Sequence, residues 1–439
     1  GSPVKVAVCI SPEEDPSFES FGAGAGDQRL PAPEEIAGED PVSVVFSSGT
    51  TGFAKGITLS HRGIIVNANA AIHMLRPVPS DVFVSVLPLH HTYPTTCAFI
   101  SPLSVGAATL VVEKLVGKVV IDDIRDAGGS FLIAVPLLYD KVMAGIQQGY
   151  KALPSIVRAV LDPLRKKALA EAYKGNPEFG QRVFKFIRKK AGLGSVRLMV
   201  AGGGPLSPKT ADFFDSLGFN IVHGYGMSEN GPLISVNTPR YKNNVSVGLP
   251  VKDTEVKILD TNEDGVGEIV VKSPSLMLGY YNDPEATGEA FTDDGYLKTG
   301  DLGHIDEQGF IFLSGRKKNL IVSSGGKNIY PEEIEAHFDK SRIIAEILIV
   351  GRRGQDNSKE QIFAVTVPNL EALEEDYPGR ELDDALLRGL IKDEIDTVNR
   401  GLPGYQKVSG FTLRRDPFEK NAQGKVRRFL HKDYESGNR

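Results

Sequence analysis

Short apolar runs alternate along the chain with segments of helical periodicity, and this alternation constrains the fold more than any other feature. Runs at 42–46, 82–87, 131–135 and 197–200 have the length of a buried strand. An amphipathic stretch at 64–75 follows the first of them. Strands that alternate with helices are typical of a doubly wound sheet. We therefore expect an α/β fold built on such a sheet.

Capping chemistry marks the start of two of the expected helices. Ser60 precedes the apolar stretch 64–75 and is predicted to be its N-cap. Ser207 and Pro208 follow a glycine triplet and are predicted to occupy the N-cap and N1 positions of a further helix.

The pattern changes in the second half of the chain. Between about 245 and 315, short strands alternate with turn residues, which predicts an antiparallel subdomain. Beyond Gly315–Asn319, a compact segment has the composition of a small α+β domain, with strands at 345–350 and 361–367 and a helix at 383–399. The predicted units are a linker or remnant of a longer N-terminal region at 1–40, a large domain at 41–316 and a small domain at 317–439.

Charge and cysteine content exclude several classes of protein. The net charge of -6 and the pI near 5.9 argue against nucleic acid as a partner, since proteins that bind it are usually basic. Cys9 and Cys97 form neither a disulfide framework nor a zinc pattern, so a reducing, cytoplasmic location is expected. No apolar run approaches the length that spans a bilayer.

The segment 141–197 is strongly basic and of helical character. It is either a solvated helical face or a surface that contacts an anionic membrane, which would place the protein peripherally on the inner membrane face. Its cations include Arg165, Lys166, Lys167, Arg188, Lys189 and Lys190.

A ten-residue loop, Ser47 to Gly56, carries the first chemical signal. Its small residues let the backbone approach a phosphate chain, its hydroxyl and N–H groups donate hydrogen bonds, and Lys55 adds a cation. No Gly-Lys-Ser/Thr triplet closes the loop, so it is not a Walker A sequence. From composition alone, a plain polar turn fits as well.

As a ten-residue string, however, this loop resembles the phosphate loop of the acyl-adenylating (AMP-binding) superfamily, which includes acyl-CoA synthetases, peptide-synthetase adenylation domains and luciferases. The family usually has Pro where this chain has Ala54, a change expected to alter the stiffness of the loop more than its chemistry. The resemblance implies a catalytic role for Thr51 and phosphate binding by Ser47, Ser48, Gly49, Thr50, Thr51, Gly52 and Lys55.

Further strings resemble motifs of this family in the expected order. The segment 225–229 resembles Tyr-Gly-x-Thr-Glu, with the hydroxyl kept by Ser228. The resemblance assigns Glu229 a catalytic role as ligand of the Mg²⁺ that accompanies ATP, which agrees with the preference of Mg²⁺ for carboxylate oxygens and phosphates. Asp301 would accept hydrogen bonds from the ribose hydroxyls. The nucleotide-binding residues implied are Gly202, Gly203, Gly204, Gly224, Tyr225, Gly226, Met227, Ser228, Asp301 and Arg316.

The resemblance also assigns residues to the acyl pocket, the hinge and the small domain. His91 would be a wall of the acyl pocket, although a structural histidine is nearly as good an interpretation. Lys318 would be the hinge pivot, and Gly325 and Gly326 would enter the site for the thiol step. Lys425, in the string 421–425, would be the catalytic lysine, with Gln423 where the family usually has Thr.

Together these resemblances imply a large multi-sheet adenylation domain with a small mobile C-terminal α+β domain, using ATP, Mg²⁺ and CoA. Leu87 to His91 and the basic insert before Val196 are most similar to long-chain fatty acyl-CoA synthetases, so the expected function is fatty acid–CoA ligation through acyl-AMP. An acyl-carrier-protein synthetase or fatty acyl-AMP ligase is the alternative.

A nucleotide-binding fragment without turnover is a further alternative. Only 46 residues precede Ser47, and the chain opens with Gly-Ser and no Met, so we expect it to be a shortened version of a longer protein. The sequence specifies neither the acyl chain length nor the oligomeric state.

Overall fold

A computed structural model describes residues 36–47, 55–112, 117–322, 327–339, 341–353, 360–420 and 426–434. Its centre is a seven-stranded sheet in the order β4-β3-β5-β6-β7-β8-β9, in which the first five strands are parallel and β8 and β9 are antiparallel. This confirms the predicted α/β fold class. The strands are β3 (Val82–Ser85), β4 (Ala108–Val111), β5 (Phe131–Ala134), β6 (Leu198–Ala201), β7 (Ile221–Gly226), β8 (Leu233–Val236) and β9 (Leu249–Pro250).

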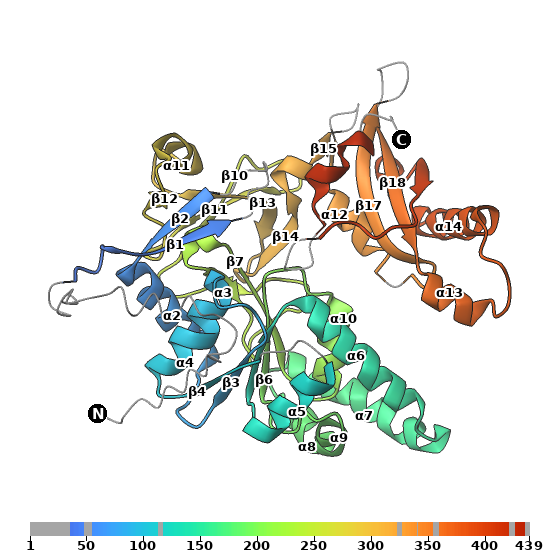
Figure 1. Cartoon of the computed structure of the whole chain (residues 1–439), viewed down its shortest axis with the longest axis horizontal. Helices are drawn as coiled ribbons and strands as arrows, with labels where there is room; N and C mark the ends of the chain where they lie inside the picture. Colours follow the sequence, from blue (N-terminus) through green and yellow to red (C-terminus); the bar gives the residue numbers. More distant parts are fainter. Residues whose placement is uncertain are drawn as a thin grey trace, which may run out of the picture.

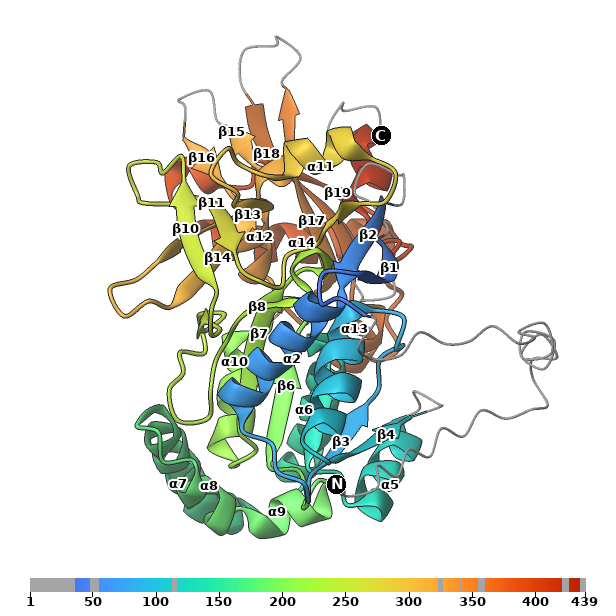
Figure 2. The ribbon, with the colours of Figure 1, turned by 90° about the vertical axis from the view of Figure 1, so that its left-hand side faces the viewer.

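Helices cover both faces of this sheet (Figures 1 and 2). Because strand side chains alternate between faces, successive residues of β5 enter different cores. Phe131 and Ile133 pack with α2, whereas Leu132 and Ala134 pack with α5, α6, α7 and α10. The main helices are α2 (His61–Leu75), α5 (Gly117–Ala127), α6 (Pro136–Lys151), α7 (Ser155–Tyr173), α8 (Glu178–Val183), α9 (Lys185–Lys190) and α10 (Pro208–Ser216).

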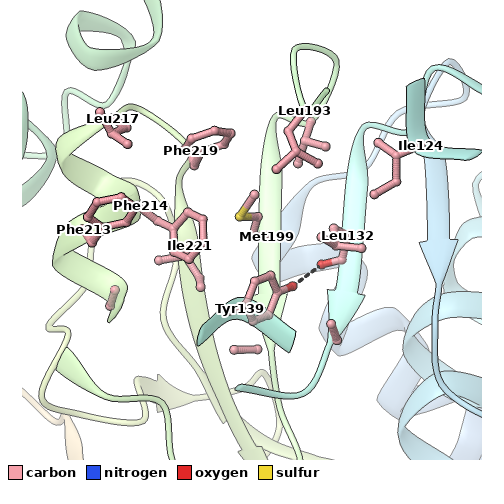
Figure 3. Packing of buried hydrophobic residues seen from close by; sticks show 14 of the residues in the cluster. Ile124, Leu132, Tyr139, Leu193, Met199, Phe213, Phe214, Leu217, Phe219 and Ile221 are labelled. Carbon is pink, nitrogen blue, oxygen red and sulfur yellow. Dashed lines mark hydrogen bonds between the residues drawn. The ribbon is translucent and has the colours of Figure 1, made fainter. Parts of the chain in front are cut away.

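The core on the face covered by α5, α6, α7 and α10 is apolar, and the Tyr139 hydroxyl buried in it is hydrogen-bonded inside the protein. Figure 3 shows Tyr139 among Leu132, Met199 and Ile221, with its hydroxyl donating to the Leu132 carbonyl at 2.7 Å. Burying this hydroxyl is tolerated because it is hydrogen-bonded. The resulting rigid platform positions the loops at the carboxyl ends of β3, β6 and β7.

The predicted capping residues are placed as expected, with one difference. Ser60 is the N-cap of α2, and its hydroxyl accepts a hydrogen bond from the Gly63 amide at 3.0 Å. Ser207 and Pro208 occupy the N-cap and N1 positions of α10, but the Ser207 hydroxyl makes no capping hydrogen bond.

The surroundings of the phosphate loop differ from the prediction. We expected a buried strand followed by a helix, but β1 (Pro41–Ser47) pairs with β2 (Lys55–Ser60) as an antiparallel hairpin, and α2 begins only after β2. The prediction of burial was also wrong: β1 has a strand partner on one side alone among the described residues, and the side chains on one of its faces are not covered. Val42, Val44 and Phe46 are consequently exposed.

An antiparallel sheet follows, as predicted for residues 245–315. Its order is β10-β11-β13-β14, with Asp301 of β13 directly opposite Arg316 of β14. The elements of this region are β10 (Glu255–Leu259), β11 (Gly267–Lys272), β12 (Gly279–Tyr280), α11 (Pro284–Ala290), β13 (Leu297–Ile305) and β14 (Ile311–Arg316). The strand β12 joins β1 and β2 in a separate three-stranded sheet.

The C-terminal part of the chain gathers at one end of the molecule, drawn in orange and red in Figure 1. The predicted strands and helix are confirmed as β17, β18 and α14. Its elements are the short helix η4 (Lys317–Asn319), β15 (Ile321–Val322), β16 (Asn328–Ile329), α12 (Pro331–Ala336), β17 (Ile344–Arg353), β18 (Glu360–Pro368), α13 (Leu370–Asp376), α14 (Asp384–Asn399), β19 (Gly410–Leu413) and η6 (Arg428–Tyr434).

The basic segment is helical, as predicted, but not all of its cations are solvated. Arg188 of α9 is buried, donates to the Val196 carbonyl and lies over the Phe219 ring. The guanidinium closes the turn after α9, so this residue is structural and does not belong to the exposed basic surface. Across the described residues, no helix combines the length and the apolar character that crossing a bilayer requires.

Candidate active site

The structure describes only part of the predicted site. Ser48, Gly49, Thr50, Thr51 and Gly52, together with Gly325, Gly326 and Lys425, lie outside the described residues, and Ser47 is described by its backbone alone. The remaining predicted residues come from six separate stretches of chain. They fall into a group around Asp301, a group around Glu229, the turn at Gly202–Gly204 and the segment 316–318.

Asp301 is the centre of the first group. The Tyr225 hydroxyl donates to its Oδ2 at 2.7 Å, and the Arg316 Nε lies 2.6 Å from its Oδ1. Burial and the adjacent Asp301 carboxylate raise the pKa of Tyr225 well above its usual range. Three residues that are widely separated in sequence, Tyr225, Asp301 and Arg316, are thus joined in one hydrogen-bonded unit.

The backbone after Tyr225 requires glycine. A Cβ added to Gly226 would lie 2.0 Å from the Pro232 carbonyl oxygen, so any side chain here would displace the neighbouring strand. This close approach turns the chain from β7 into the short helix that begins at Ser228. The turn presents the Glu229 side chain at the end of the central sheet.

Glu229 is the centre of the second group. Its Oε1 accepts a hydrogen bond from the Tyr280 hydroxyl at 3.1 Å, and the Lys55 ammonium lies 4.6 Å from the centre of the Tyr280 ring. Burial and the Glu229 charge raise the pKa of Tyr280. The lysine of the predicted phosphate loop and the predicted Mg²⁺ ligand therefore contact the same tyrosine.

The donor set at Glu229 fits Mg²⁺ held jointly with substrate. Within the described residues, no cluster of His, Cys, Asp and Glu could hold a metal alone. Mg²⁺ typically uses one or two carboxylates together with substrate phosphates and keeps several waters. A single carboxylate matches that requirement, and the assignment of Glu229 as the protein ligand stays a prediction.

The glycine turn is packed against the loop after β3. A Cβ on Gly202 would lie 2.7 Å from Cζ of Tyr93, whose hydroxyl donates to the Val200 carbonyl at 3.1 Å. Gly203 has φ +77°, a left-handed conformation that favours glycine. Thr92 donates to Ser228 at 3.1 Å, so this loop also contacts the Glu229 turn.

His91 precedes these contacts and is partly buried. Its Nε2 has no hydrogen-bond partner among the described residues, and burial, with a contribution from the adjacent His90, lowers its pKa. A cavity of about 300 Å³ nearby is lined by His90 and not by His91. The assignment of His91 to the acyl pocket stays a prediction.

Charged contacts connect the segment 316–318 to the antiparallel sheet β10-β11-β13-β14. Lys317 pairs with Glu268 at 2.7 Å, and the other oxygen of Glu268 accepts from the Gly300 amide, one residue before Asp301. Desolvation, followed by the charges of Arg316 and Arg428, lowers the pKa of Lys318 to about 8. The charged form of the predicted pivot is therefore less favourable than that of a lysine in water.

Residues on both sides of 421–425 are fixed to the C-terminal part. Lys420 pairs with Val426 in an antiparallel bridge, and the Lys420 ammonium lies 2.5 Å from Glu346 of β17. Arg428 donates to both carboxylate oxygens of Glu335 on α12 and to the Ile349 carbonyl. The residues on either side of the segment 421–425, which contains Lys425, are therefore held against the C-terminal part.

Several residues of the site were missed by reasoning from the sequence. Glu268 and Tyr280 lie in the region 245–315, which we predicted only as short strands and turns, and no role was predicted for Tyr93 or Arg428. The available signal was weak: a tyrosine or carboxylate in an apolar strand requires a polar partner when it is buried. The sequence does not say which partner it finds.

The chain matches a known protein family and several curated relatives. The profile of the family described as AMP-binding enzyme matches residues 2–281. A relative from Arabidopsis thaliana, long chain acyl-CoA synthetase 7, peroxisomal, is 30% identical over 412 residues, which cover 88% of this chain and 57% of the relative. Human long-chain-fatty-acid–CoA ligase 1 is 28% identical over 423 residues, covering 90% and 59%.

A third relative has a different acceptor in its name. A chloroplastic long-chain-fatty-acid–[acyl-carrier-protein] ligase of Arabidopsis thaliana is 27% identical over 429 residues, covering 85% of this chain and 57% of the relative. The chain spans little more than half the length of these relatives.

Solved structures share the fold. ATP-bound MatB from Rhodopseudomonas palustris superposes with a TM-score of 0.71 at 24% identity, covering 94% of this chain and 72% of that one. MenE from Bacillus subtilis, in complex with ATP and magnesium ion, gives a TM-score of 0.69 at 23% identity, covering 91% and 71%. At this identity the similarity establishes the fold alone.

Proposed function

Because the chain belongs to the AMP-binding enzyme family, we propose that it is an AMP-forming acid–thiol ligase that converts a long-chain fatty acid into acyl-AMP and then into acyl-CoA. The single observation that carries this proposal is the convergence of Tyr225, Asp301 and Arg316 in one hydrogen-bonded unit. A second unit joins Glu229, which follows β7, to Tyr280 and Lys55.

Each unit has the chemistry that one part of ATP requires. The Asp301 carboxylate accepts hydrogen bonds and suits vicinal ribose hydroxyls, while Arg316 beside it is a fixed cation for the nucleotide. The Gly202–Gly204 turn offers a flat backbone surface for adenine. Lys55 lies next to the phosphate loop, where a cation offsets the charge of the triphosphate.

The first half-reaction needs charge neutralisation more than proton transfer. A fatty acid is already ionised at pH 7, so no general base is required. Its carboxylate oxygen forms a bond to the α-phosphorus as the bond to pyrophosphate breaks. Lys55 and Lys425 would stabilise the charge as it moves to the leaving group, and Mg²⁺ held on Glu229 would supply further neutralisation of the phosphates.

The second half-reaction transfers the acyl group to a thiol. The thiolate sulfur attacks the acyl carbonyl of the mixed anhydride, and AMP leaves with its carboxyl-linked oxygen. Lys425 would obstruct this approach, so we include a rotation of the C-terminal part, residues 317–439, about Lys318, which brings in Gly325 and Gly326. Rigid-body gating of this kind is common in enzymes.

The proposal extends to substrate, acceptor and location. The names of the relatives support a long-chain fatty acid and CoA, and one of them favours acyl carrier protein as the second candidate acceptor. We place the protein in the cytoplasm, in peripheral contact with the inner membrane face through residues 141–197. A fragment that binds nucleotide without turnover remains the competing function.

A panel of acids and acceptors tests the proposal. Pyrophosphate release from ATP would be measured with fatty acids of graded length, with CoA, with pantetheinylated carrier protein and with neither. Release that depends on the acid and turns over faster with CoA is the expected result. Stimulation by carrier protein alone would assign the second acceptor. Binding of ATP with no release for any acid would overturn the enzyme assignment in favour of the nucleotide-binding fragment.

A further inference from the structure

Residues 141–197 have a positive net charge, whereas the rest of the chain is acidic. They contain thirteen Lys and Arg side chains against three Asp and Glu, a net charge of +10 in a chain whose total is -6. Concentrated charge of this kind creates a local field that attracts an anionic surface even when the whole protein is acidic. The location of these cations therefore matters more than the overall pI.

Within the part of the chain that the structure describes, the three carboxylates of this segment form an ion pair with one of its lysines, Lys174. Asp162 accepts a hydrogen bond from the Tyr150 hydroxyl at 2.7 Å. Glu171 pairs with Lys174 at 3.2 Å, and Glu178 pairs with Arg240 outside the segment at 2.8 Å. The exposed lysines Lys166, Lys185, Lys189 and Lys190 are thus left to interact with solvent or with a partner, while the ammonium of the exposed Lys167 lies 4.9 Å from the centre of the Phe179 ring.

The outer face of α7 also carries apolar side chains that the core does not use. Its inner face is occupied by Leu161, Leu164 and Ala168, which pack in the core on the face covered by α5, α6, α7 and α10. Beside this row, on the exposed side of the helix, Ile156 is 75% exposed and Val160 is 62% exposed. These two residues are one helical turn apart, and Lys167 continues the same row two turns further on.

The helix α9 repeats this combination. Phe186 is 73% exposed, and Lys189 and Lys190 lie on the same side of the helix, while Ile187 and Arg188 point inward. Exposed large apolar residues are unremarkable singly, but apolar residues interleaved with lysines on successive helices are typical of a surface that enters the interface of a bilayer. The lysine ammonium groups would reach lipid phosphates, and the apolar side chains would enter the acyl boundary.

We propose that the outer face of α7 and α9 binds the surface of an anionic lipid bilayer. The proposal rests on the function proposed above in one respect: an enzyme that consumes long-chain fatty acids benefits from a position where they partition. The helices α7, α8 and α9 lie at the end of the molecule opposite the C-terminal part in both views (Figures 1 and 2). Binding through this end leaves the C-terminal part free to rotate.

Sedimentation with vesicles tests the surface without ATP or fatty acid present. Phosphatidylcholine vesicles and vesicles that also contain phosphatidylglycerol would be compared at low and high salt. We expect binding to the anionic vesicles alone, with an affinity that falls as salt rises. The variant K166Q/K167Q should weaken it about 25-fold, at roughly fivefold per lysine. I156S/V160S should weaken it at both salt concentrations.

Matched control variants test whether vesicle binding depends on this face and not on exposed lysines or apolar residues elsewhere in the protein. K252Q/K407Q removes two exposed lysines elsewhere, and I65S removes an apolar residue of α2 that is 48% exposed. Both should bind vesicles like the unaltered chain. Equal binding by all variants, or no binding to anionic vesicles, would overturn the proposal and return 141–197 to a solvated helical face. Acid-dependent pyrophosphate release without vesicle binding would overturn the membrane proposal and leave the enzyme assignment intact. Vesicle binding without pyrophosphate release would support the membrane proposal and overturn the enzyme assignment.

Discussion

Glu229 illustrates how much a single side chain depends on residues far away in sequence. Its carboxylate is oriented by the Tyr280 hydroxyl, and the same aromatic ring lies beneath the Lys55 ammonium. A carboxylate that must meet a metal and a phosphate at once benefits from being held in one rotamer before they arrive. Tyr280 is therefore a positioning residue, because it acts through Glu229 and Lys55.

Removing the Tyr280 hydroxyl tests this role. In Y280F the ring remains under Lys55, but Glu229 loses a hydrogen bond to a charged acceptor. We expect the Mg²⁺ concentration that half-saturates ATP binding to rise about fivefold, measured by calorimetry. Y281F, at the neighbouring and more exposed tyrosine, is the control and should be unchanged. An identical Mg²⁺ dependence in both variants would contradict the assignment.

His91 gives a prediction about stability and pH. Burial lowers its pKa in the folded chain, while the unfolded imidazole keeps its usual value near 6.5. Below that pH the unfolded state binds more protons, so the stability of the fold falls as the pH falls. One proton contributes at most about 1.4 kcal/mol per pH unit. Urea unfolding between pH 6.5 and 5 should show a flatter pH dependence for H91Q. An unchanged slope would mean that His91 is not the group responsible.

The role of a single residue could be predicted from the sequence where the residue belongs to a motif of several residues. The strings around Tyr225 and Asp301 located both residues, and the structure places their side chains in contact. Tyr280 could not be found this way, because its role depends on β12 pairing with β2. That pairing brings residue 280 to the phosphate-loop hairpin, and nothing local in the sequence encodes it.

At the scale of elements, the hairpin of β1 and β2 is the clearest correction. A glycine- and hydroxyl-rich loop after a strand suggests a helix N-terminus, where amide groups bind phosphate. Here the residues after the loop alternate between the two faces of a strand and pair with β1, so the loop connects two strands. Lys55, at the start of β2, takes its position from that ladder.

The contact of Arg428 with α12 holds the last described segment, 426–434, against the C-terminal part. Both side chains are largely buried, so R428M would leave the Glu335 carboxylate without its cation. Breaking such a pair costs about 3 kcal/mol. We expect R428M to lower the unfolding free energy by that order in urea. R427M, at the exposed neighbouring position, is the matched control, and equal stability of the two variants would refute the role of Arg428.

At the scale of the whole molecule, the alternation of strand and helix predicted the central sheet, and the turn-rich texture predicted the antiparallel sheet after it. The burial of Arg188 and the exposure of Val42, Val44 and Phe46 were not predictable, because each depends on which elements pack around the residue. The composition of residues 141–197 predicted where the positive charge lies. Only the packing of α7 and α9 shows which of these cations are solvated and which are structural.

The central claim is that this fold activates a carboxylic acid with ATP through Lys425, and pyrophosphate release tests it most directly. Release would be measured with ATP, Mg²⁺ and a long-chain fatty acid for the unaltered chain, for K425A and for K407A, an exposed lysine of the same part of the chain. The account predicts acid-dependent release that K425A lowers at least 100-fold, about 2.7 kcal/mol of transition-state stabilisation, with ATP binding retained and K407A unaffected. Acid-dependent release that persists in K425A would contradict the role of the lysine, and release independent of any acid would contradict the claim itself.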